Sequence, residues 1–309
     1  MELLELTSDD YKNLVKEPFT IFDSVAFMKL NEHKVDKVNY ASFNNGKNRF
    51  GLIFGERDSI LVSPFSSPYS CFTPITKNNK IKSYTETCEA LVKHAKKSGM
   101  KKIKITLPPL MYDEDHITKI YNSLYICGFK IAGCDINYHY CLDEFDDEYQ
   151  SKILPQARQK LKNALSNNLR FEKTDNIELA YDVIKQNREA KGYPLWMTLD
   201  EVYQTINVVK TDFFLVYDEN NAPVASAMVY HVTNDCVQVI YWGNTVGSDS
   251  LRPMNFLSFK TLEYYRSENK AIFDVGPSTE FSIPNNGLCD FKQSIGCKTS
   301  PKFTFEMEL

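Results

Sequence analysis

The sequence predicts an α/β protein of two similar domains, each with a mixed sheet of antiparallel and parallel strands flanked by helices. Each half contains three alternating apolar segments separated by short polar turns, which is the pattern of an antiparallel meander. After each meander, amphipathic helices alternate with single strands, which indicates a crossover to a parallel strand. This order recurs at an offset of about 175 residues for the meander and about 168 for the later elements, which indicates a duplication.

The first half provides the elements in the following order. Meander strands are expected at 37–43, 49–54 and 59–63. The next helix is expected to begin at Ser83, because Ser83 and Glu86 have the spacing of a capping box, and to end at Gly99. The remaining elements are a strand over 102–107, a helix ended by Gly128 and a strand over 134–142.

The second half repeats this order after a connecting segment, 146–175, which contains a basic helix and a strand. Its meander is expected at 212–217, 223–232 and 236–243. Pro253 suits the first turn of the helix that follows. The last elements are a strand over 271–276, a short helix around "LCDFKQSI", Gly296 and a strand over 302–309. We therefore expect one domain at 1–147 and a second at 148–309.

Composition sets limits on location and partners. The chain has 309 residues, 43% hydrophobic residues and a net charge of −4, which is typical of a soluble globular protein without a global attraction to nucleic acid. No signal peptide and no run of 18 apolar residues is recognised, so a cytoplasmic location is expected. The eight cysteines include no CxxC pair, so no metal site is expected. Serine-hydrolase, dinucleotide-binding and P-loop motifs are also missing.

Two segments of the second half, "PQARQKLKNALSNNLRFE" (155–172) and "GLCDFKQSIG" (287–296), carry a family resemblance. Together with the repeated element order, they resemble the GNAT acyltransferase superfamily and, within it, the tandem-domain Fem-like aminoacyltransferases that build peptidoglycan cross-bridges. The family's Gly-x-x-x-Phe-Lys-x-x-x-Gly pattern is matched by Gly287, Phe291, Lys292 and Gly296. The resemblance implies two tandem GNAT-like acyl-CoA N-acyltransferase domains, with one working cleft in the second and the first as scaffold or acceptor platform.

The resemblance also implies roles for particular residues. Lys292 would stabilise negative charge on the carbonyl under attack, an effect worth about 3 kcal/mol in a dry cleft, and Phe291 would exclude water. The alternative is a solvated lysine beside a core phenylalanine. Asp274 and Glu280 are both candidates for the base that deprotonates the acceptor amine, and the sequence does not choose between them. The substrate-binding candidates are Arg158, Arg188, Tyr193, Tyr241, Trp242, Asn244, Arg252 and Asn255.

The acyl donor is expected to be either aminoacyl-tRNA or acyl-CoA, with no tightly bound cofactor. The glycine-rich turn that holds the CoA pyrophosphate in GNAT enzymes is missing at 241–257 and at 63–86, which disfavours CoA. Transfer RNA would require local basic surface. Two clusters supply it: Lys93, Lys96, Lys97, Lys101, Lys102 and Lys104, and then Lys152, Arg158, Lys160 and Lys162. The long coiled-coil insertion common in Fem proteins is absent.

The expected function is therefore transfer of an acyl or aminoacyl group to an amine of a cell-wall or polysaccharide precursor. The resemblance implies direct attack without a covalent enzyme intermediate, and the absence of any serine or cysteine motif supports this. The alternatives are a GNAT-type N-acetyltransferase that uses acyl-CoA and a catalytically silent binding protein with the same fold.

Overall fold

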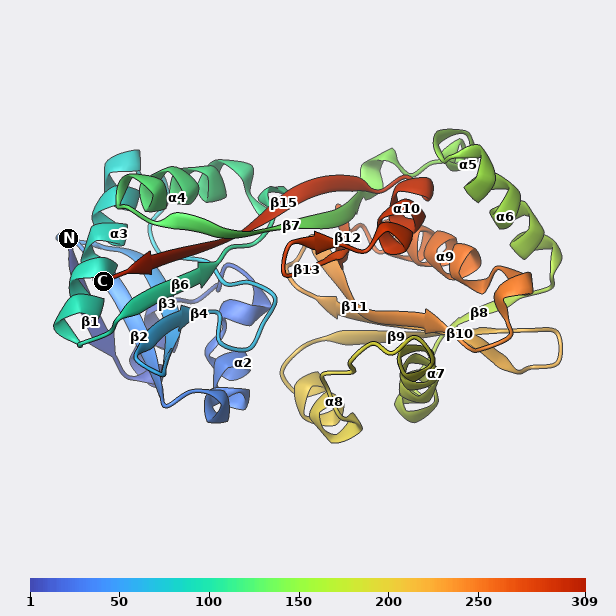
Figure 1. The fold of residues 1–309 in the computed structure, drawn as a ribbon, viewed down its shortest axis with the longest axis horizontal. Helices are drawn as coiled ribbons and strands as arrows, with labels where there is room; N and C mark the ends of the chain where they lie inside the picture. Colours follow the sequence, from blue (N-terminus) through green and yellow to red (C-terminus); the bar gives the residue numbers. More distant parts are fainter. The chain divides into compact units, whose positions relative to one another are not determined.

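The computed structural model describes residues 1–309 and divides into two compact units (Figure 1). The first unit consists of 1–136, 281–283 and 300–309, and the second of 137–280 and 284–299. This division corrects the expected boundary at 147, because two strands, β7 (Lys130–Cys141) and β15 (Lys298–Glu308), each run from one unit into the other. The last strand of each half of the chain pairs with the sheet of the other half. Periodicity in a sequence shows that a segment has an apolar face, but not which sheet it joins.

The first unit is a sheet with the order β1-β2-β3-β4-β6-β15, in which only β4 and β6 pair in parallel. Its other strands are β1 (Glu2–Leu6), β2 (Lys37–Asn44), β3 (Asn48–Arg57), β4 (Ile60–Ser63), β5 (Thr73–Pro74) and β6 (Lys102–Thr106). Its helices are α1 (Ser8–Leu14), α2 (Val25–Leu30), α3 (Ile81–Lys97) and α4 (Glu114–Ile126), with short 3-10 helices at Ile21–Asp23, Glu32–Lys34 and Leu110–Tyr112.

The second unit has the matching order β8-β9-β10-β11-β12-β7, in which only β11 and β12 pair in parallel. Its strands are β8 (Arg170–Lys173), β9 (Thr211–Tyr217), β10 (Pro223–His231), β11 (Cys236–Asn244) and β12 (Ile272–Pro277), followed by the hairpin β13 (Thr279–Glu280) and β14 (Ile283–Pro284). Its helices are α5 (Tyr149–Lys152), α6 (Pro155–Ser166), α7 (Ile177–Ala190), α8 (Leu199–Ile206), α9 (Pro253–Ser267) and α10 (Asn286–Ser294), with 3-10 helices at Leu142–Glu144 and Asp249–Leu251. The identical order in both units confirms the predicted repeat.

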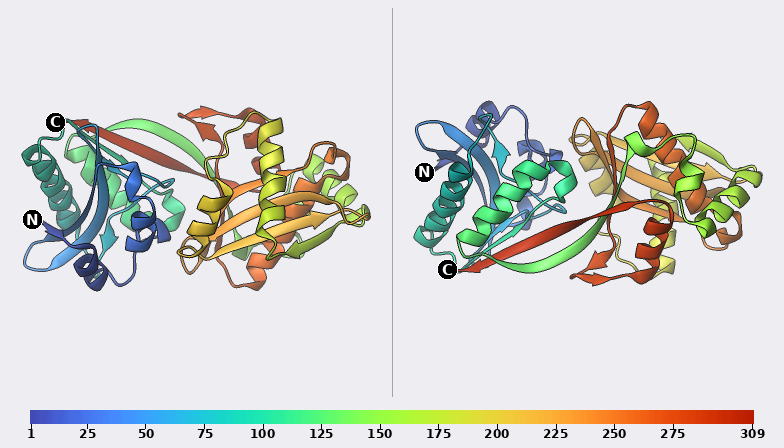
Figure 2. Two further views of the ribbon diagram at one scale, coloured as in Figure 1. Left: turned by 90° about the horizontal axis from the view of Figure 1, so that it is seen from below. Right: turned by 90° about the horizontal axis from the view of Figure 1, so that it is seen from above.

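Helices cover both faces of the second sheet. The helix α7 packs across β10 and β11 on one face, while α9 packs on the same strands from the other (Figure 2). Apolar side chains at helical spacing explain this placement: Val183 and Ile184 of α7 and Leu262 of α9 are all buried. The core of the second unit therefore has two layers, one on each side of the sheet.

Most predicted helix ends are correct. Gly99, Gly128 and Gly296 follow α3, α4 and α10, and each has a positive φ that ends a helix without steric cost. The expected capping box at Ser83 is wrong, since α3 begins two residues earlier and places Ser83 inside its first turn. The elements β1, α1, α2 and α8 were not predicted. The capping box of α8, formed by Thr198 and Glu201, was a sequence signal for that helix.

Candidate active cleft

The candidate cleft arises where the two parallel strands of the second unit separate. The strands β11 and β12 pair over only three positions, ending at Gln238 and Asp274. Beyond that point each strand carries an extra residue relative to its other neighbour, Ile240 in β11 and Val275 in β12. Such bulges bend a strand and increase its local twist. The two bulges therefore separate the strands and open a space between them.

This space is a cleft of about 410 Å³ lined by α7, the loop 191–198, β11, the first turn of α9, β12 and α10. Three cationic side chains line it: Arg188, Lys191 and Lys292. Serine, threonine, cysteine, histidine, aspartate and glutamate are all absent from the lining. The cleft thus offers positive charge, amide groups, tyrosine hydroxyls and apolar surface, but neither a nucleophile of the usual kind nor a carboxylate base.

Lys292 lies in the wall of the cleft on α10, and its side chain is only 3% exposed. Its ammonium group donates hydrogen bonds to the carbonyl oxygens of Val275, Gly276 and Pro277 at 2.9, 2.8 and 3.0 Å. An ammonium group has three donors, so all three are used on the bulged end of β12. Burial lowers the pKa of Lys292 to about 8, against the opposing influence of Cys297 and Asp274. Lys292 is therefore not the expected free cation, and its buried ammonium group instead links α10 to β12 through hydrogen bonds.

The two carboxylates expected as bases lie outside the cleft. Asp274 is fully buried, and its carboxylate accepts hydrogen bonds from the Asn137 side chain and the Gly276 amide, both at 2.8 Å. The Asp274 carboxylate therefore stabilises the bulge of β12 through its bond to the Gly276 amide. Glu280 is exposed in the β13–β14 hairpin and does not line the cleft. In this geometry neither group reaches an acceptor amine bound in the cleft.

Arg188, Tyr193 and Tyr241 do come together in the cleft. The Arg188 guanidinium carbon lies 5.1 Å from the ring centre of Tyr241 and 5.8 Å from that of Tyr193. Its Nε donates to the carbonyl oxygen of Pro194 at 2.7 Å, while its two terminal nitrogens have no partner in the protein. Burial lowers the pKa of Arg188, although the two tyrosines oppose this. A cation held between aromatic rings without a carboxylate is suited to an anionic ligand.

Phe291 and Trp242 form an aromatic wall on the other side of the cleft. Their rings meet edge to face, with centres 6.0 Å apart and planes at 70°. Both residues line the cleft, and their roles in substrate binding and water exclusion stay predictions. The sheet places Trp242 there because it lies two residues beyond the bulge at Ile240.

Four other predicted residues are not part of the lining. Asn244 is buried and ties the turn after β11 through hydrogen bonds to Ser248 and Asp249. Arg252 is exposed at the start of α9, and Asn255 is buried inside that helix. Arg158 donates to the carbonyl oxygens at the end of α5, so it joins α5 to α6. These residues are polar near a helix or strand end, and sequence alone did not separate structural from binding roles.

Sequence reasoning missed three polar residues of the cleft: Asn187, Lys191 and Asn285. Asn187 donates to the Asn244 carbonyl oxygen at 2.7 Å, directly against Gly243, where a Cβ would lie 2.5 Å from the Asn187 side chain. Asn285 caps α10 with its oxygen and donates to the Tyr193 hydroxyl at 2.9 Å with its nitrogen. The Asn before a helix was a readable cap signal, but its second bond to the loop depends on tertiary contact.

The corresponding separation in the first unit is filled by the chain itself. The strands β4 and β6 pair in parallel as far as Ser63 and Ile105. The segment that follows β4 then turns into the gap, and the Ser70 amide donates to the Thr106 carbonyl oxygen at 3.0 Å. Tyr69 in this segment is fully buried. The structure therefore leaves the second unit as the one with an open cleft between its parallel strands.

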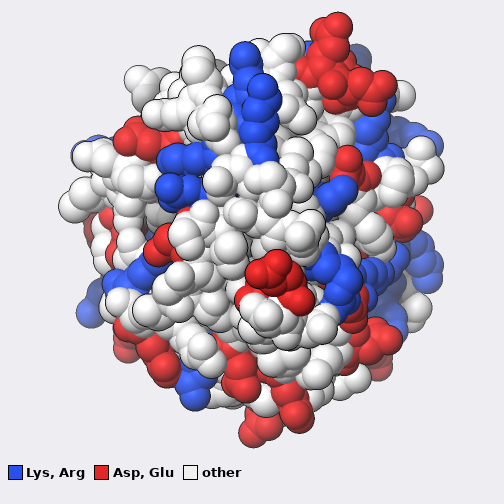
Figure 3. All heavy atoms as spheres, turned by 90° about the vertical axis from the view of Figure 1, so that its right-hand side faces the viewer, with Lys and Arg blue, Asp and Glu red and all other residues white.

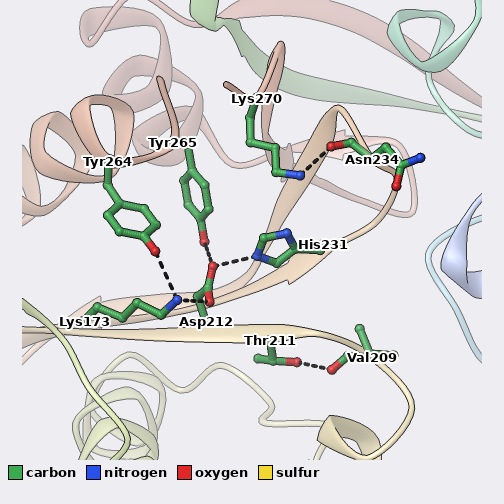
Figure 4. A network of polar contacts seen from close by, with 9 residues as sticks. All are labelled: Lys173, Val209, Thr211, Asp212, His231, Asn234, Tyr264, Tyr265 and Lys270. Atoms are coloured by element: carbon green, nitrogen blue, oxygen red, sulfur yellow. Dashed lines mark hydrogen bonds and ion pairs between the residues drawn. The ribbon is translucent and has the colours of Figure 1, made fainter. Parts of the chain in front are cut away.

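A separate polar network lies where β9 and β10 face α9 (Figure 4). The Asp212 carboxylate accepts hydrogen bonds from His231 and Lys173, both at 2.7 Å, and from the Tyr265 hydroxyl at 2.9 Å. Burial alone would raise the pKa of Asp212, but its partners hold the pKa well below its usual value. The network lies outside the cleft and joins β8, β9, β10 and α9, so its role is structural.

The second basic cluster, which contains Lys152, Arg158, Lys160 and Lys162, does not form a uniformly positive surface (Figure 3). Figure 3 shows basic side chains interspersed with acidic ones over the end of the second unit. Lys152 pairs with Asp146 at 2.5 Å, and Arg158 is used on backbone carbonyls. In the first cluster, Lys102 and Lys104 pair with Glu306. Part of the expected phosphate-binding charge is therefore neutralised within the protein.

No family model matches the chain, and no curated protein is similar to it. Solved structures do share its fold. The crystal structure of FemX has a TM-score of 0.73 at 14% identity, covering 100% of this chain and 98% of FemX. L-PGS from Bacillus licheniformis has a TM-score of 0.61 at 10% identity, covering 97% and 92%. A tandem GNAT protein from the clavulanic acid biosynthesis pathway has a TM-score of 0.53 at 9% identity, covering 99% and 98%.

The chain therefore has the tandem GNAT-like fold, of the Fem type, that its sequence predicts. None of its helices has both the length and the apolar character that crossing a membrane requires.

Proposed function

We propose that the cleft of the second unit transfers an acyl or aminoacyl group to an amine of a cell-wall or polysaccharide precursor. The observation that carries this proposal is the lining of the cleft, which has three cations and no serine, cysteine, histidine or carboxylate. Acyl transfer through a covalent enzyme intermediate requires a nucleophile, so this lining favours direct attack by the acceptor. The fold shared with FemX supports the same class of reaction.

In the proposed reaction, the acceptor nitrogen bonds to the donor's carbonyl carbon and the ester or thioester bond breaks. The proton lost by the amine ends on the leaving oxygen or sulfur. Negative charge develops on the carbonyl oxygen, and the unpaired terminal nitrogens of Arg188 are available donors for it or for an anionic part of a substrate. Lys292 acts chiefly as a positioning residue, since an oxyanion role would require it to release one of its three carbonyl partners.

The cleft contains no carboxylate to act as a base, so the acceptor amine must react in its neutral form. The fraction of neutral amine increases tenfold per pH unit below the pKa of the amine. We therefore expect kcat/KM to rise with pH up to that pKa. A bell-shaped profile with an acidic limb near the pKa of a carboxylate would contradict direct attack without a protein base.

Aminoacyl-tRNA is the donor that we favour over acyl-CoA. In GNAT enzymes backbone amides at a helix start hold the CoA pyrophosphate. Here α9 starts at Pro253, which has no N–H, after Arg252 in a left-handed conformation. Acyl-CoA stays the runner-up, because Arg188 and Lys191 suit any phosphate.

Thermal melting with acetyl-CoA, longer acyl-CoAs and charged tRNA at two salt concentrations tests the donor. A donor at 100 times its Kd stabilises the fold by about 2.7 kcal/mol, which is a shift of several degrees. A salt-sensitive shift with charged tRNA, and transfer of its amino acid to an amine seen by mass spectrometry, would support the proposal. A salt-insensitive shift with a CoA ester would identify acyl-CoA, and not aminoacyl-tRNA, as the donor. No shift with any donor would indicate a silent binding protein.

Arg188→Ala provides the residue-level test, with Arg170→Ala as its matched control. Arg170 is exposed on β8 and lies outside the cleft. We expect the first variant to lose at least tenfold in kcat/KM, because it removes the unpaired cation from the cleft, and the second to behave as wild type. Equal activity of both variants would show that Arg188 takes no part in binding or catalysis.

A further inference from the structure

Two cysteines of the first unit, Cys88 and Cys127, meet between the helices α3 and α4. Cys88 lies in the middle of α3, and Cys127 follows the last residue of α4. One turn earlier on the same two helices, the hydroxyl oxygens of Thr85 and Ser123 are 3.4 Å apart. At the next turn the Cys88 and Cys127 side chains form a hydrogen bond. The packing of α3 on α4 therefore brings two thiols that are distant in the sequence into contact.

The two thiols differ in their access to solvent. Cys88 is only 2% exposed and belongs to the hydrophobic core of the unit. Cys127 is half-buried, and its neighbours in the chain, Ile126 and Gly128, are exposed. The Cys127 sulfur also lies 3.8 Å from the Thr85 carbonyl oxygen, which fixes its position against α3. A small solute can therefore reach Cys127, whereas Cys88 is covered.

Their contact makes Cys127 the more reactive thiol of the pair. The hydrogen bond from Cys88 lowers the pKa of the Cys127 thiol, although burial and Glu89 oppose this. The same bond, together with burial, raises the pKa of the Cys88 thiol. Because the thiolate is the form that attacks an oxidant, Cys127 reacts first and Cys88 stays a thiol beside it. An accessible thiolate next to a second cysteine is the arrangement of redox-sensitive pairs.

The end of α4 has room for a bond between the two sulfurs. A disulfide requires them to approach to about 2.05 Å, which is closer than thiols joined by a hydrogen bond. Cys127 is followed by Gly128, which has a φ of +94° and where a Cβ would meet nothing closer than 3.8 Å. Because the chain turns there in open space, Cys127 can shift toward α3 while Cys88 keeps its place in the core.

We propose that Cys127 and Cys88 form a reversible disulfide when the protein is exposed to hydrogen peroxide. First, the Cys127 sulfur bonds to one peroxide oxygen and the O–O bond breaks. The other oxygen leaves as water with the proton lost by Cys127, which becomes a sulfenic acid. The Cys88 sulfur then bonds to the Cys127 sulfur, and the S–O bond breaks.

The hydroxyl group of the sulfenic acid leaves as a second water, with the proton of Cys88. In total, two thiols lose two electrons and two protons, and one peroxide is reduced to two waters. This modification site goes beyond the proposed function and does not depend on it, because it lies in the first unit, away from the residues of the cleft.

Peptide mapping of the wild-type protein tests the proposal without any substitution. The folded protein is treated with hydrogen peroxide, the excess is removed, and remaining thiols are blocked with N-ethylmaleimide as the protein is unfolded. Trypsin then releases each cysteine in a peptide of its own, 83–93 for Cys88 and 120–130 for Cys127. We expect mass spectrometry to find these two peptides joined, and reduction with a dithiol to separate them.

Variants assign the order of the two steps. Cys88→Ser should leave Cys127 as a sulfenic acid that dimedone traps, and Cys127→Ser should leave Cys88 reduced. Cys134→Ser is the matched control, because Cys134 is an exposed cysteine of the same unit, and it should give the joined peptide at the wild-type rate. In wild type, Cys127 should react at least about tenfold faster than Cys71, whose burial raises its pKa.

Three results would overturn the proposal. The first is that the peptides 83–93 and 120–130 stay separate at a peroxide concentration that oxidises the exposed Cys134. The second is that the joined peptide forms only when the protein is unfolded before the peroxide is added. The third is that Cys127 pairs with another cysteine in preference to Cys88.

Discussion

Raising the pH above neutrality should stabilise the protein through one buried side chain, Lys292. Burial lowers its pKa from 10.5 to about 8 in the folded protein. Between these two values the unfolded chain binds more protons than the folded protein, so the free energy of unfolding rises with pH. The whole difference corresponds to about 3 kcal/mol, of which about 2 kcal/mol falls between pH 7.5 and pH 10.

Urea unfolding of wild type and Lys292→Met at several values between pH 7.5 and pH 10 measures this contribution. Tyrosines of the unfolded chain also begin to titrate in this range, but they are shared by both proteins and cancel in the difference. We expect wild type to gain about 2 kcal/mol relative to Lys292→Met over the range. Lys191→Met, which removes an exposed ammonium from the same cleft, should keep the wild-type dependence.

A difference between wild type and Lys292→Met that is constant with pH would refute the reasoning. It would mean that the Lys292 ammonium is hydrated in the folded protein, and not held by three carbonyl oxygens. The oxyanion role suggested by the family resemblance would then regain its structural basis.

Three further predictions concern stability elsewhere. Burial raises the pKa of Asp23 to about 6, so wild type should gain about 2 kcal/mol between pH 6 and pH 4 relative to Asp23→Asn; a flat difference in urea unfolding would contradict this. Asp212→Asn should lower the free energy of unfolding by about 3 kcal/mol at pH 7, because His231 loses its buried partner. This loss should become smaller below about pH 4, where the Asp212 carboxyl of the unfolded chain is protonated. Gly243→Ala should lower stability by about 1–3 kcal/mol, because its Cβ would lie 2.5 Å from the Asn187 side chain. Gly287→Ala, whose Cβ meets nothing closer than 3.6 Å, is the control in thermal melting, and equal Tm losses would contradict the steric argument.

The sequence determined the order of the elements and their repetition, because both depend on local signals. Alternation within strands, helical spacing of apolar residues and glycines with a positive φ after helices act over a few residues, and each is visible in the chain. The same signals identified α10 and placed Phe291 and Lys292 on it. These local signals did not predict β1, α1 and α2, because these short segments have weak periodicity.

Tertiary structure alone decided the division of the chain and the composition of the cleft. Pairing of β15 with β6, and of β7 with β12, joins residues more than a hundred positions apart, and no local pattern encodes the partner. The bulges in β11 and β12 are likewise defined by the strands beside them. Lys292 shows the physical reason most directly: its residue type predicted a free cation, but its chemistry depends on three carbonyl oxygens that only the folded chain brings within hydrogen-bonding distance.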